Sequence, residues 1–507
     1  MEGRKHFLTD LLGALLSYVL LIFRVGYYFG DGDQEEVLGQ ILYKLGNAGL
    51  ANDFLVSSVG GAWTVRTPFV FLMTLFGESN LEFAFIAMHI LVYVAMLYFM
   101  IRICRQFVNT QFALLTPLIA VVILYAKSPG ANDLYSGHLI AESLSVLMAT
   151  LALYYWLKDS FFIAGIGLLL GVLFHPLNGI QVFLLLLGAS FLANRKEVLA
   201  NWKSWSLPFT LSFIYIFWLQ VQSSSGGIGS ELYFSLLVKF RNPHHYLPSH
   251  FPIEQIIGLL VMMVLVGLIF RKKNGFVRNW ILLTLIGLVI FSLGAEMLEN
   301  TMIVKTQWFK TTIWVRMWFA IACIYWLDRL NVKELSHTVQ NASLVVLVLI
   351  AIYITAIRDG NSAVLNWKGI SNQSLLDISE KCEQELEADA LFIQPIGTTG
   401  FQYASKKPLF VSFKSVLHYP VFFAKWHGRL IPVYGELDTD QSGFNQFGIA
   451  DSNYHNPQEI YLSYLKGEGV DYMLTTKQID NPSLEIVFYN EDYWVYKLKP
   501  PLRKERL

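Results

Sequence analysis

The sequence predicts a polytopic α-helical membrane protein with about eleven transmembrane helices and a C-terminal soluble α/β domain on the outer side. Of the 507 residues, 54% are hydrophobic and only 15% are charged, whereas soluble domains average about 25% charged residues. Apolar runs of roughly 17 to 25 residues recur, and each is long enough to cross a hydrocarbon core of about 30 Å. An isolated run of this kind satisfies its backbone hydrogen bonds in hydrocarbon only as a helix. The formal net charge is zero, so nothing indicates a nucleic-acid partner.

The expected spans follow these apolar runs along the chain. The first is interpreted as a retained span, because no small-residue cleavage site follows it. The spans lie near 8–28, 82–102, 112–126, 142–157, 161–174, 177–193, 205–221, 253–270, 279–297, 310–327 and 341–357. The apolar stretch 67–77 is shorter and is interpreted as an interfacial or re-entrant helix. We therefore expect a transmembrane domain over residues 1–357, with an acidic first outer loop at about 29–81.

The basic residues predict the direction of the spans. Lys and Arg near span ends favour the cytoplasmic side of the membrane. With eleven spans, four basic groups fall on one side: Arg4 and Lys5; Arg102 and Arg105; Arg195, Lys196 and Lys203; Arg271, Lys272, Lys273 and Arg278. We therefore expect a cytoplasmic N-terminus and an extracytoplasmic C-terminal domain.

The C-terminal part of the chain changes character. Residues 358–383 are polar and are interpreted as a linker, and residues 384–507 as an extracytoplasmic α/β domain. Its expected strands are 390–395, 408–413, 471–476 and a hairpin over 485–498 that turns at Asn490–Asp492. Its expected helices are 415–429 and 457–467.

The first outer loop begins with "DGDQEE" (residues 31–36), directly after the first span. Asp33 can serve as the N-cap of a helix that starts here, with Glu36 as its partner in a variant of the capping box. Asp31 is explained less well by capping. A carboxylate at an outer membrane surface can also act as a general base towards an acceptor hydroxyl, or hold a divalent cation beside a phosphate.

Cationic side chains recur on the same expected face. The loop "FRNPHHYLPSH" (residues 240–250) carries Arg241, His244 and His245. Arg and His form charge-assisted hydrogen bonds to phosphate. Metal ligation by the two His and an interfacial loop without a ligand are the alternatives. His175, in the break "FHPLNG", is either a polar cap or a further ligand on this face.

Arg316 lies within the apolar run of the tenth span. An ionised side chain there is unfavourable unless it faces a partner or a wet cavity. Arg316 can extend its charged end to the outer surface, or it can contact a lipid phosphate.

This layout resembles the GT-C superfamily of membrane glycosyltransferases, which take a sugar from a polyprenyl-phosphate carrier. The resemblance covers the whole chain: a cytoplasmic N-terminus, an acidic first loop, many spans and a soluble outer domain. It implies that Asp33 or Asp31 matches the position of the family's catalytic acidic residue. It also implies a polyprenyl-phosphate-linked sugar as donor, a glycan, lipid or protein as acceptor, and a place in the bacterial inner (plasma) membrane.

The function predicted from these features is sugar transfer on the outer face of the membrane. Asp33 or Asp31 would activate the acceptor hydroxyl, and Arg241, His244, His245, Arg316 and His175 would bind the substrate and its leaving phosphate. The alternatives are a transporter or flippase for a lipid-linked glycan, and a non-catalytic assembly protein. Apart from Arg316 and Arg24, the spans carry few ionisable residues, which disfavours transport.

Overall fold

The computed structural model describes residues 6–30, 32–124, 128–223, 228–271, 274–329, 345 and 372–500. These residues form two compact units. Unit 1 is drawn from Met1–Tyr27, Ile86–Trp218 and His244–Leu365, and unit 2 from Tyr28–Phe85, Leu219–Pro243 and Asn366–Leu507.

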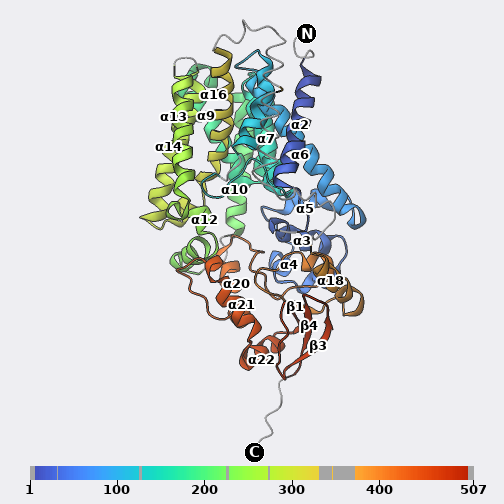
Figure 1. The fold of residues 1–507 in the computed structure, drawn as a ribbon. Helices are drawn as coiled ribbons and strands as arrows, with labels where there is room; N and C mark the ends of the chain where they lie inside the picture. The colour runs from blue at the N-terminus through green and yellow to red at the C-terminus, as the bar shows by residue number, and fades with distance from the viewer. Residues whose placement is uncertain are drawn as a thin grey trace, which may run out of the picture. The chain divides into compact units, whose positions relative to one another are not determined.

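Unit 1 is a bundle of helices, whose long members run side by side in Figure 1. Its helices are α2 (Phe7–Val25), α6 (Leu81–Cys104, in this unit from Ile86), η4 (Gln111–Leu115), η5 (Leu118–Ile123), α7 (Ala141–Trp156), α8 (Phe161–Phe174), α9 (Pro176–Ala200), α10 (Trp202–Ser223, in this unit up to Trp218), α12 (Pro243–Tyr246, from His244), η7 (Pro248–His250), α13 (Ile253–Phe270), α14 (Gly275–Glu296), α15 (Thr301–Val304), η8 (Trp308–Thr311) and α16 (Thr312–Arg329).

Six helices of the described chain are long and apolar enough to cross a membrane. They are Phe7–Val25, Glu78–Cys104, Pro176–Ala200, Trp202–Gln222, Ile253–Phe270 and Gly275–Glu296. The chain is therefore an integral, helical membrane protein. The expected spans 142–157 and 161–174 coincide with the shorter helices α7 and α8, and 310–327 with α16. The expected span 341–357 lies outside the described residues, apart from Val345.

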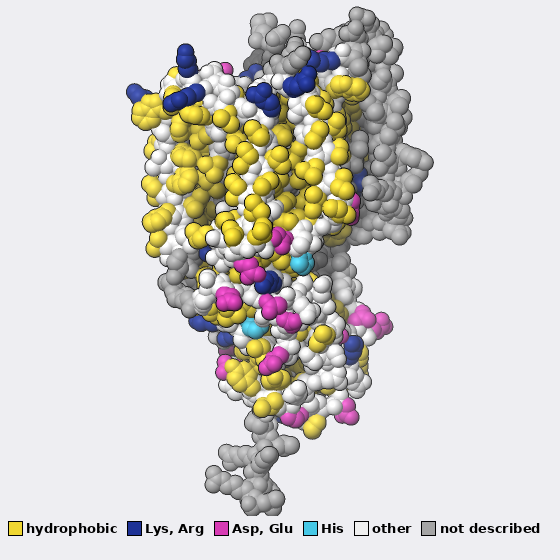
Figure 2. Space-filling view, turned by 90° about the vertical axis from the view of Figure 1, so that its left-hand side faces the viewer, with side chains coloured by type: hydrophobic (Ala, Val, Ile, Leu, Met, Phe, Trp, Pro, Cys, Tyr) yellow, Lys and Arg dark blue, Asp and Glu magenta, His cyan; other side chains and the backbone are white. Residues whose placement is uncertain are grey.

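The flank of unit 1 suits contact with lipid. Figure 2 shows hydrophobic side chains covering this flank, with Lys and Arg gathered at one end of it. The exposed apolar side chains include Leu260, Val264 and Leu268 on α13, and Leu282 and Ile286 on α14. A soluble protein rarely exposes so continuous an apolar surface, so this flank is the part that faces the hydrocarbon.

Contacts within unit 1 bring basic segments to a common end of the bundle. Arg102 and Arg105, at and just beyond the end of α6, both form ion pairs with Asp10 in the first turn of α2, at 3.3 and 2.7 Å. Phe107, just beyond them, packs its ring 5.6 Å from that of Phe270, the last residue of α13. Arg102 and Arg105 therefore lie at the same end of the bundle as Arg271, which follows Phe270.

Unit 2 combines the first loop with the C-terminal domain. Its elements are η1 (Gly32–Gln34), α3 (Glu35–Lys44), η2 (Ala48–Asn52), α4 (Phe54–Val59), α5 (Thr67–Thr74), η3 (Glu78–Asn80), α11 (Ser230–Phe234), η6 (Ser235–Arg241), α18 (Gln373–Glu385), β1 (Leu391–Ile393), α19 (Phe401–Ser405), α20 (Pro420–Tyr434), η10 (Gly443–Gln446), α21 (Phe447–His455), α22 (Glu459–Gly467), β2 (Val470–Thr475), β3 (Leu484–Tyr489) and β4 (Trp494–Leu498). The stretch 67–77 contains only α5, whose eight residues rise about 12 Å, too short to span a membrane.

A four-stranded mixed sheet organises the C-terminal part of unit 2, in the order β1-β2-β4-β3 (Figure 1). β1 pairs with β2 in parallel, and the other pairs are antiparallel. The hairpin expected over 485–498 is present as β3 and β4, and Asn490 N donates to Tyr493 O across its turn at 2.9 Å. The core of the sheet contains Phe392, Leu474 and Val495, all fully buried.

Two expectations for this region are corrected. Residues 408–413 form only an isolated parallel bridge to β1, between Leu409 and Phe392, instead of a strand. Beyond this bridge, the carbonyl groups of Phe410 and Ser412 accept hydrogen bonds from the side chains of Arg429 and Trp426. The second part of the expected linker is the helix α18, because Leu375, Ile378 and Cys382 recur at helical spacing and pack into the core of the sheet. Residues 358–371 of that linker lie outside the described residues, and the proposed domain boundaries stay a prediction.

Asp53 anchors the first loop to the C-terminal residues of unit 2. It is buried and accepts hydrogen bonds from Val56 N and Leu409 N, both at 3.0 Å, and from the Gln402 side chain. Burial raises the pKa of the Asp53 carboxyl to about 6, although these hydrogen bonds lower it. The first loop is therefore an integral part of unit 2.

We expect the stability of unit 2 to fall as Asp53 ionises. Its folded-state pKa of about 6 lies above the ordinary value of 3.8, so the folded state holds the proton more tightly. This stabilisation is complete below pH of about 4 and is lost as the pH rises through about 6. At about 1.4 kcal/mol per pKa unit, the loss is about 3 kcal/mol. The thermal unfolding midpoint of the purified protein, measured at pH 4.5 and pH 7.5, should differ less in Asp53→Asn than in the wild type. An identical pH dependence in both would contradict this role.

Candidate functional site

Asp33 does not cap a helix in the structure, contrary to the capping interpretation. It lies in the short helical turn η1, and the N-cap of α3 is Gln34, with no capping hydrogen bond from its side chain. Gln34 instead accepts from Gly30 N at 2.8 Å. The Asp33 side chain is 58% exposed. Asp33 is therefore not the N-cap of α3, and more than half of its side chain is accessible.

Asp33 pairs instead with a residue of the C-terminal part of unit 2. Lys414 Nζ lies 2.7 Å from Asp33 Oδ1. The backbone of Lys414 is held in turn by Arg241, whose Nη2 donates to Lys414 O at 3.0 Å. The Arg241 guanidinium packs 5.1 Å from the ring centroids of both Phe413 and Phe444. Arg241 is buried, so it fixes the position of the segment that carries Lys414.

A second ion pair lies beside the first. Glu36, in the first turn of α3, pairs with Arg66, and Arg66 Nη1 donates to Val416 O at 2.7 Å. Burial raises the pKa of Glu36, and the nearby Asp33 raises it further, whereas Arg66, Lys414 and Arg241 lower it. These charges therefore form one electrostatic group, which we name the Asp33 cluster: Asp33, Glu36, Arg66, Arg241 and Lys414.

The Asp33 cluster contains one accessible carboxylate, that of Asp33, and buried arginines that hold the backbone around its partner Lys414. Lys414 holds the Asp33 carboxylate in one orientation while leaving it exposed. The buried parts of the cluster, Arg66 and Arg241, fasten the supporting backbone at residues 414 and 416. A preorganised carboxylate of this kind can accept a proton from a hydroxyl group that reaches it.

A separate group of charges gathers in unit 1. Lys310 Nζ contacts both carboxylate oxygens of Glu142, at 2.8 and 2.7 Å. His175 Nε2 lies 3.8 Å from the same carboxylate, and its Nδ1 accepts from Asn178 N as the N-cap of α9. His175 is therefore both a helix cap and part of a charged group.

His244 and His245 lie in this unit as well. Their rings are 4.2 Å apart on the short helix α12. His245 Nδ1 is 2.7 Å from Gly130 O, and His245 interacts electrostatically with Glu142. The structure thus brings together His175, His245 and Glu142, which lie far apart in the sequence.

Arg316 is buried in the second turn of α16 and faces a carboxylate of the same unit. Its Nη1 lies 4.0 Å from Asp133 Oδ1, in the loop before α7. A buried arginine in an apolar helix usually has such a partner. The contact accounts for the presence of Arg316 in an apolar helix, and it places a cation beside the loop that leads to Glu142.

The predicted site residues are divided between the two units. Arg241 belongs to unit 2 with Asp33, whereas His244 and His245 belong to unit 1 with His175 and Arg316. Asp31 lies outside the described residues. The expectation that Arg241 and Arg316 contact the same phosphate stays a prediction.

No metal centre is evident in the part of the chain that the structure describes. Among these residues, no group of three or more His, Cys, Asp or Glu side chains is arranged to hold a metal ion. Among the described residues, the pair His244 and His245 has no third ligand of this kind.

The sequence interpretation did not single out Arg66 or Glu142 as members of these charged groups. Arg66 stands next to the apolar stretch 67–77 within the first loop, which is the signal that could have drawn attention to it. The pairing of Lys414 with Asp33 joins residues 381 positions apart, and no local pattern predicts such a contact.

The comparisons with known proteins bear on the fold. No protein-family model matches the chain, and no curated protein sequence matches it. The crystal structure of the Archaeoglobus fulgidus oligosaccharyltransferase, tethered through a disulfide bond to an acceptor peptide containing the NVT sequon, matches with a TM-score of 0.56. The match covers 93% of this chain and 69% of that chain, at 12% sequence identity. The chain therefore shares its overall fold with that oligosaccharyltransferase structure. The resemblance stated from the sequence is confirmed at this level.

Proposed function

We propose that the protein is a membrane glycosyltransferase that moves a sugar from a polyprenyl-phosphate donor to an acceptor on the outer face of the membrane. The observation that carries the proposal is the exposed Asp33 carboxylate, held by Lys414 at the start of the first loop of a GT-C fold. The acceptor is a glycan, a lipid or a protein.

Asp33 is proposed as the general base, with Asp31 as the alternative. The carboxylate takes the proton of the acceptor hydroxyl while the hydroxyl oxygen attacks the anomeric carbon of the sugar. The bond between that carbon and the phosphate oxygen breaks, with inversion at the carbon. The polyprenyl phosphate leaves with the bonding electron pair. A positioned base of this kind contributes roughly 100-fold or more to the rate.

The cations are proposed to stabilise the leaving phosphate. Arg316, His175, His244 and His245 are the candidates in unit 1, and the buried position of Arg316 favours strong interaction with an anion. Arg241 is proposed to act through Lys414, whose backbone it holds.

The eleven-span topology is part of the proposal. The N-terminus would lie in the cytoplasm and residues 384–507 outside, in the inner (plasma) membrane of a bacterium. The proximity of the basic segments after α6 and α13 supports it, because Lys and Arg accumulate on the cytoplasmic side.

Cysteine labelling tests this topology. Single cysteines at Ser249 and Gln441, both exposed, should react with a membrane-impermeant maleimide in intact cells. A cysteine at the exposed Lys203 is the matched control and should react only after lysis. The reverse pattern would overturn the topology. The native cysteines Cys104 and Cys382 are buried, whereas Cys323 is only partly buried. All three single-cysteine proteins therefore also carry Cys323→Ser, which keeps the background low.

The function is tested by comparing lipid-linked sugars in cells with and without the gene. Loss of the protein should cause one polyprenyl-phosphate sugar to accumulate, and a plasmid copy of the gene should reverse this. Restoration to the same extent by a double variant with Asp33→Asn and Asp31→Asn would contradict the catalytic proposal.

A further inference from the structure

A cavity in unit 2 lies among residues that the proposed reaction does not use. Its volume is about 540 Å³, within the range of about 300–1,000 Å³ typical of small-molecule sites. It is lined by Asn52, Glu387, Asp389, Ala390, Leu391, Arg429, Glu468, Gly469, Asp471, Tyr472 and Lys497. The first loop, the segments leading into β1 and β2, α20 and β4 all contribute to its wall.

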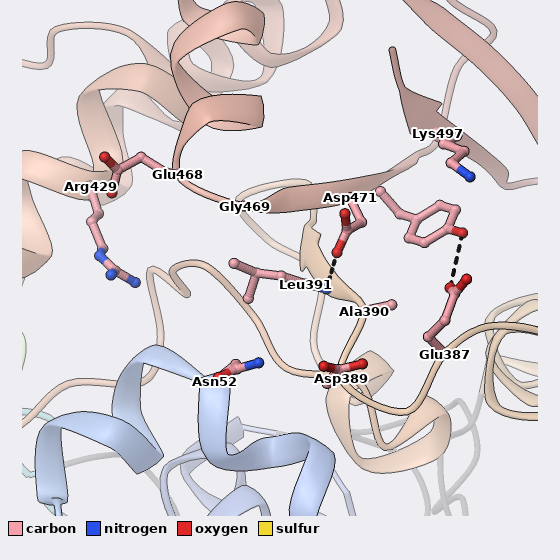
Figure 3. A pocket seen from close by; sticks show the side chains of 11 residues that line it. Asn52, Glu387, Asp389, Ala390, Leu391, Arg429, Glu468, Gly469, Asp471 and Lys497 are labelled. Atoms are coloured by element: carbon pink, nitrogen blue, oxygen red, sulfur yellow. Dashed lines mark hydrogen bonds between the residues drawn. The ribbon is translucent and has the colours of Figure 1, made fainter. Parts of the chain in front are cut away.

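The polar groups of the cavity surround it from several directions. In Figure 3, Arg429 and Glu468 lie at one end and Lys497 and Glu387 at the other, with Asn52 and Asp389 along one side. Within the described chain, the side chains of Asn52, Asp389 and Glu468 form no hydrogen bond or ion pair of their own. Their hydrogen-bonding capacity therefore remains for a ligand.

Arg429 is fixed in place before any ligand arrives. Its guanidinium packs 4.6 Å from the ring centroid of Phe54 and 4.5 Å from that of Phe410. Its Nη1 donates to Phe410 O at 2.8 Å. A guanidinium carries five N–H donors, so most of its donors are left for the cavity. Preorganised donors reduce the entropy lost on binding.

The lining excludes several ligand classes. Four carboxylates and two cations give it a formal charge of −2, which disfavours a phosphate or an acidic ligand. The apolar lining is limited to Ala390, Leu391 and the Tyr472 ring, too little for a lipid chain. Arg429 and Lys497 lie near opposite ends of the cavity and would repel a polycation.

We propose that this cavity binds an uncharged saccharide. Sugar hydroxyls donate to carboxylates and accept from guanidinium, ammonium and amide groups at the same time, and this cavity presents all of these groups. The proposal goes beyond the proposed function and does not rest on it, because binding is measured without sugar transfer. It assigns a saccharide-binding role to the soluble part of unit 2.

The test uses the full-length protein in lipid nanodiscs free of sugar detergents. Saturation-transfer NMR and calorimetry would measure the binding of lactose, cellobiose and N,N′-diacetylchitobiose, with digalacturonate and spermidine as the charged comparisons. We expect at least one of the three uncharged disaccharides to bind, and to bind more tightly than digalacturonate. Binding of none of them, or binding of spermidine alone, would overturn the proposal.

Variants connect binding to the cavity. Asp389→Ala and Glu468→Ala each remove an exposed carboxylate and should weaken the binding of the disaccharide about 10-fold or more, because hydrogen bonds to charged groups are the strong ones. Glu485→Ala is the matched control, an exposed carboxylate on β3 outside the cavity, and should bind as the wild type does. If the wild type and the three variants bind the disaccharide with equal affinity, the sugar binds outside this cavity. That result would contradict the assignment.

Discussion

Asp33→Asn is expected to lower turnover about 100-fold or more, because it removes the proton acceptor while keeping the size of the side chain. The fold should survive, since an exposed ion pair such as Asp33–Lys414 contributes at most about 1 kcal/mol. Steady-state transfer rates at matched protein concentration measure the effect, and thermal unfolding confirms that the variant is folded.

Lys414→Gln is the matched control for this variant. Both substitutions break the ion pair, but only Asp33→Asn removes the carboxylate. If Asp33 acts as the base, Lys414→Gln should lose far less activity. If the two variants lose similar amounts of transfer activity, Asp33 serves only as a structural partner of Lys414. Asp31→Asn must be measured beside them. A large loss of transfer activity in that variant alone would mean that Asp31, and not Asp33, is the general base.

Arg316→Gln is expected to raise the KM for the polyprenyl-phosphate sugar by roughly 10- to 100-fold. A hydrogen bond to a charged group contributes about 1.5–3 kcal/mol, and the buried guanidinium has little water to compete with a phosphate. The measurement is initial-rate kinetics with the donor varied at a saturating acceptor concentration.

Asp133→Asn separates this role from a structural one. It also breaks the contact of 4.0 Å between Arg316 and Asp133, yet it leaves the cation in place. The donor KM should therefore rise in Arg316→Gln and not in Asp133→Asn. Equal increases would mean that Arg316 serves only to hold the loop before α7.

The membrane class was predictable because it depends on composition and on the length of apolar runs. The hairpin of β3 and β4 was also predictable, because its alternating residues and its turn at Asn490 are local in sequence. The strand expected at 408–413 is reduced to one bridge for a non-local reason: side chains of α20, Arg429 and Trp426, take the carbonyl groups of Phe410 and Ser412. The helix α18 was missed because its single buried stripe is short, although Leu375, Ile378 and Cys382 have the correct spacing.

The candidate site was predictable in its residue types but not in its pairings. Asp33 was singled out by its place at the membrane exit, and His175 by the break in an apolar run. The capping interpretation of Asp33 failed because η1 precedes α3 and makes Gln34 the N-cap. The partners Lys414 and Glu142 are set by tertiary packing, which no spacing in the sequence encodes.

The most direct test of the account is sugar transfer by the purified protein in proteoliposomes. The donor is a polyprenyl-phosphate sugar with a radiolabel in the sugar, identified from the lipid that accumulates without the gene, and membrane extract from the deletion strain supplies the acceptor. We expect the wild type to move the label from the lipid phosphate to an acceptor and to release polyprenyl phosphate. We expect the double variant, with Asp33→Asn and Asp31→Asn, to do neither. Undiminished transfer by that double variant, or no transfer by the wild type, would contradict the account.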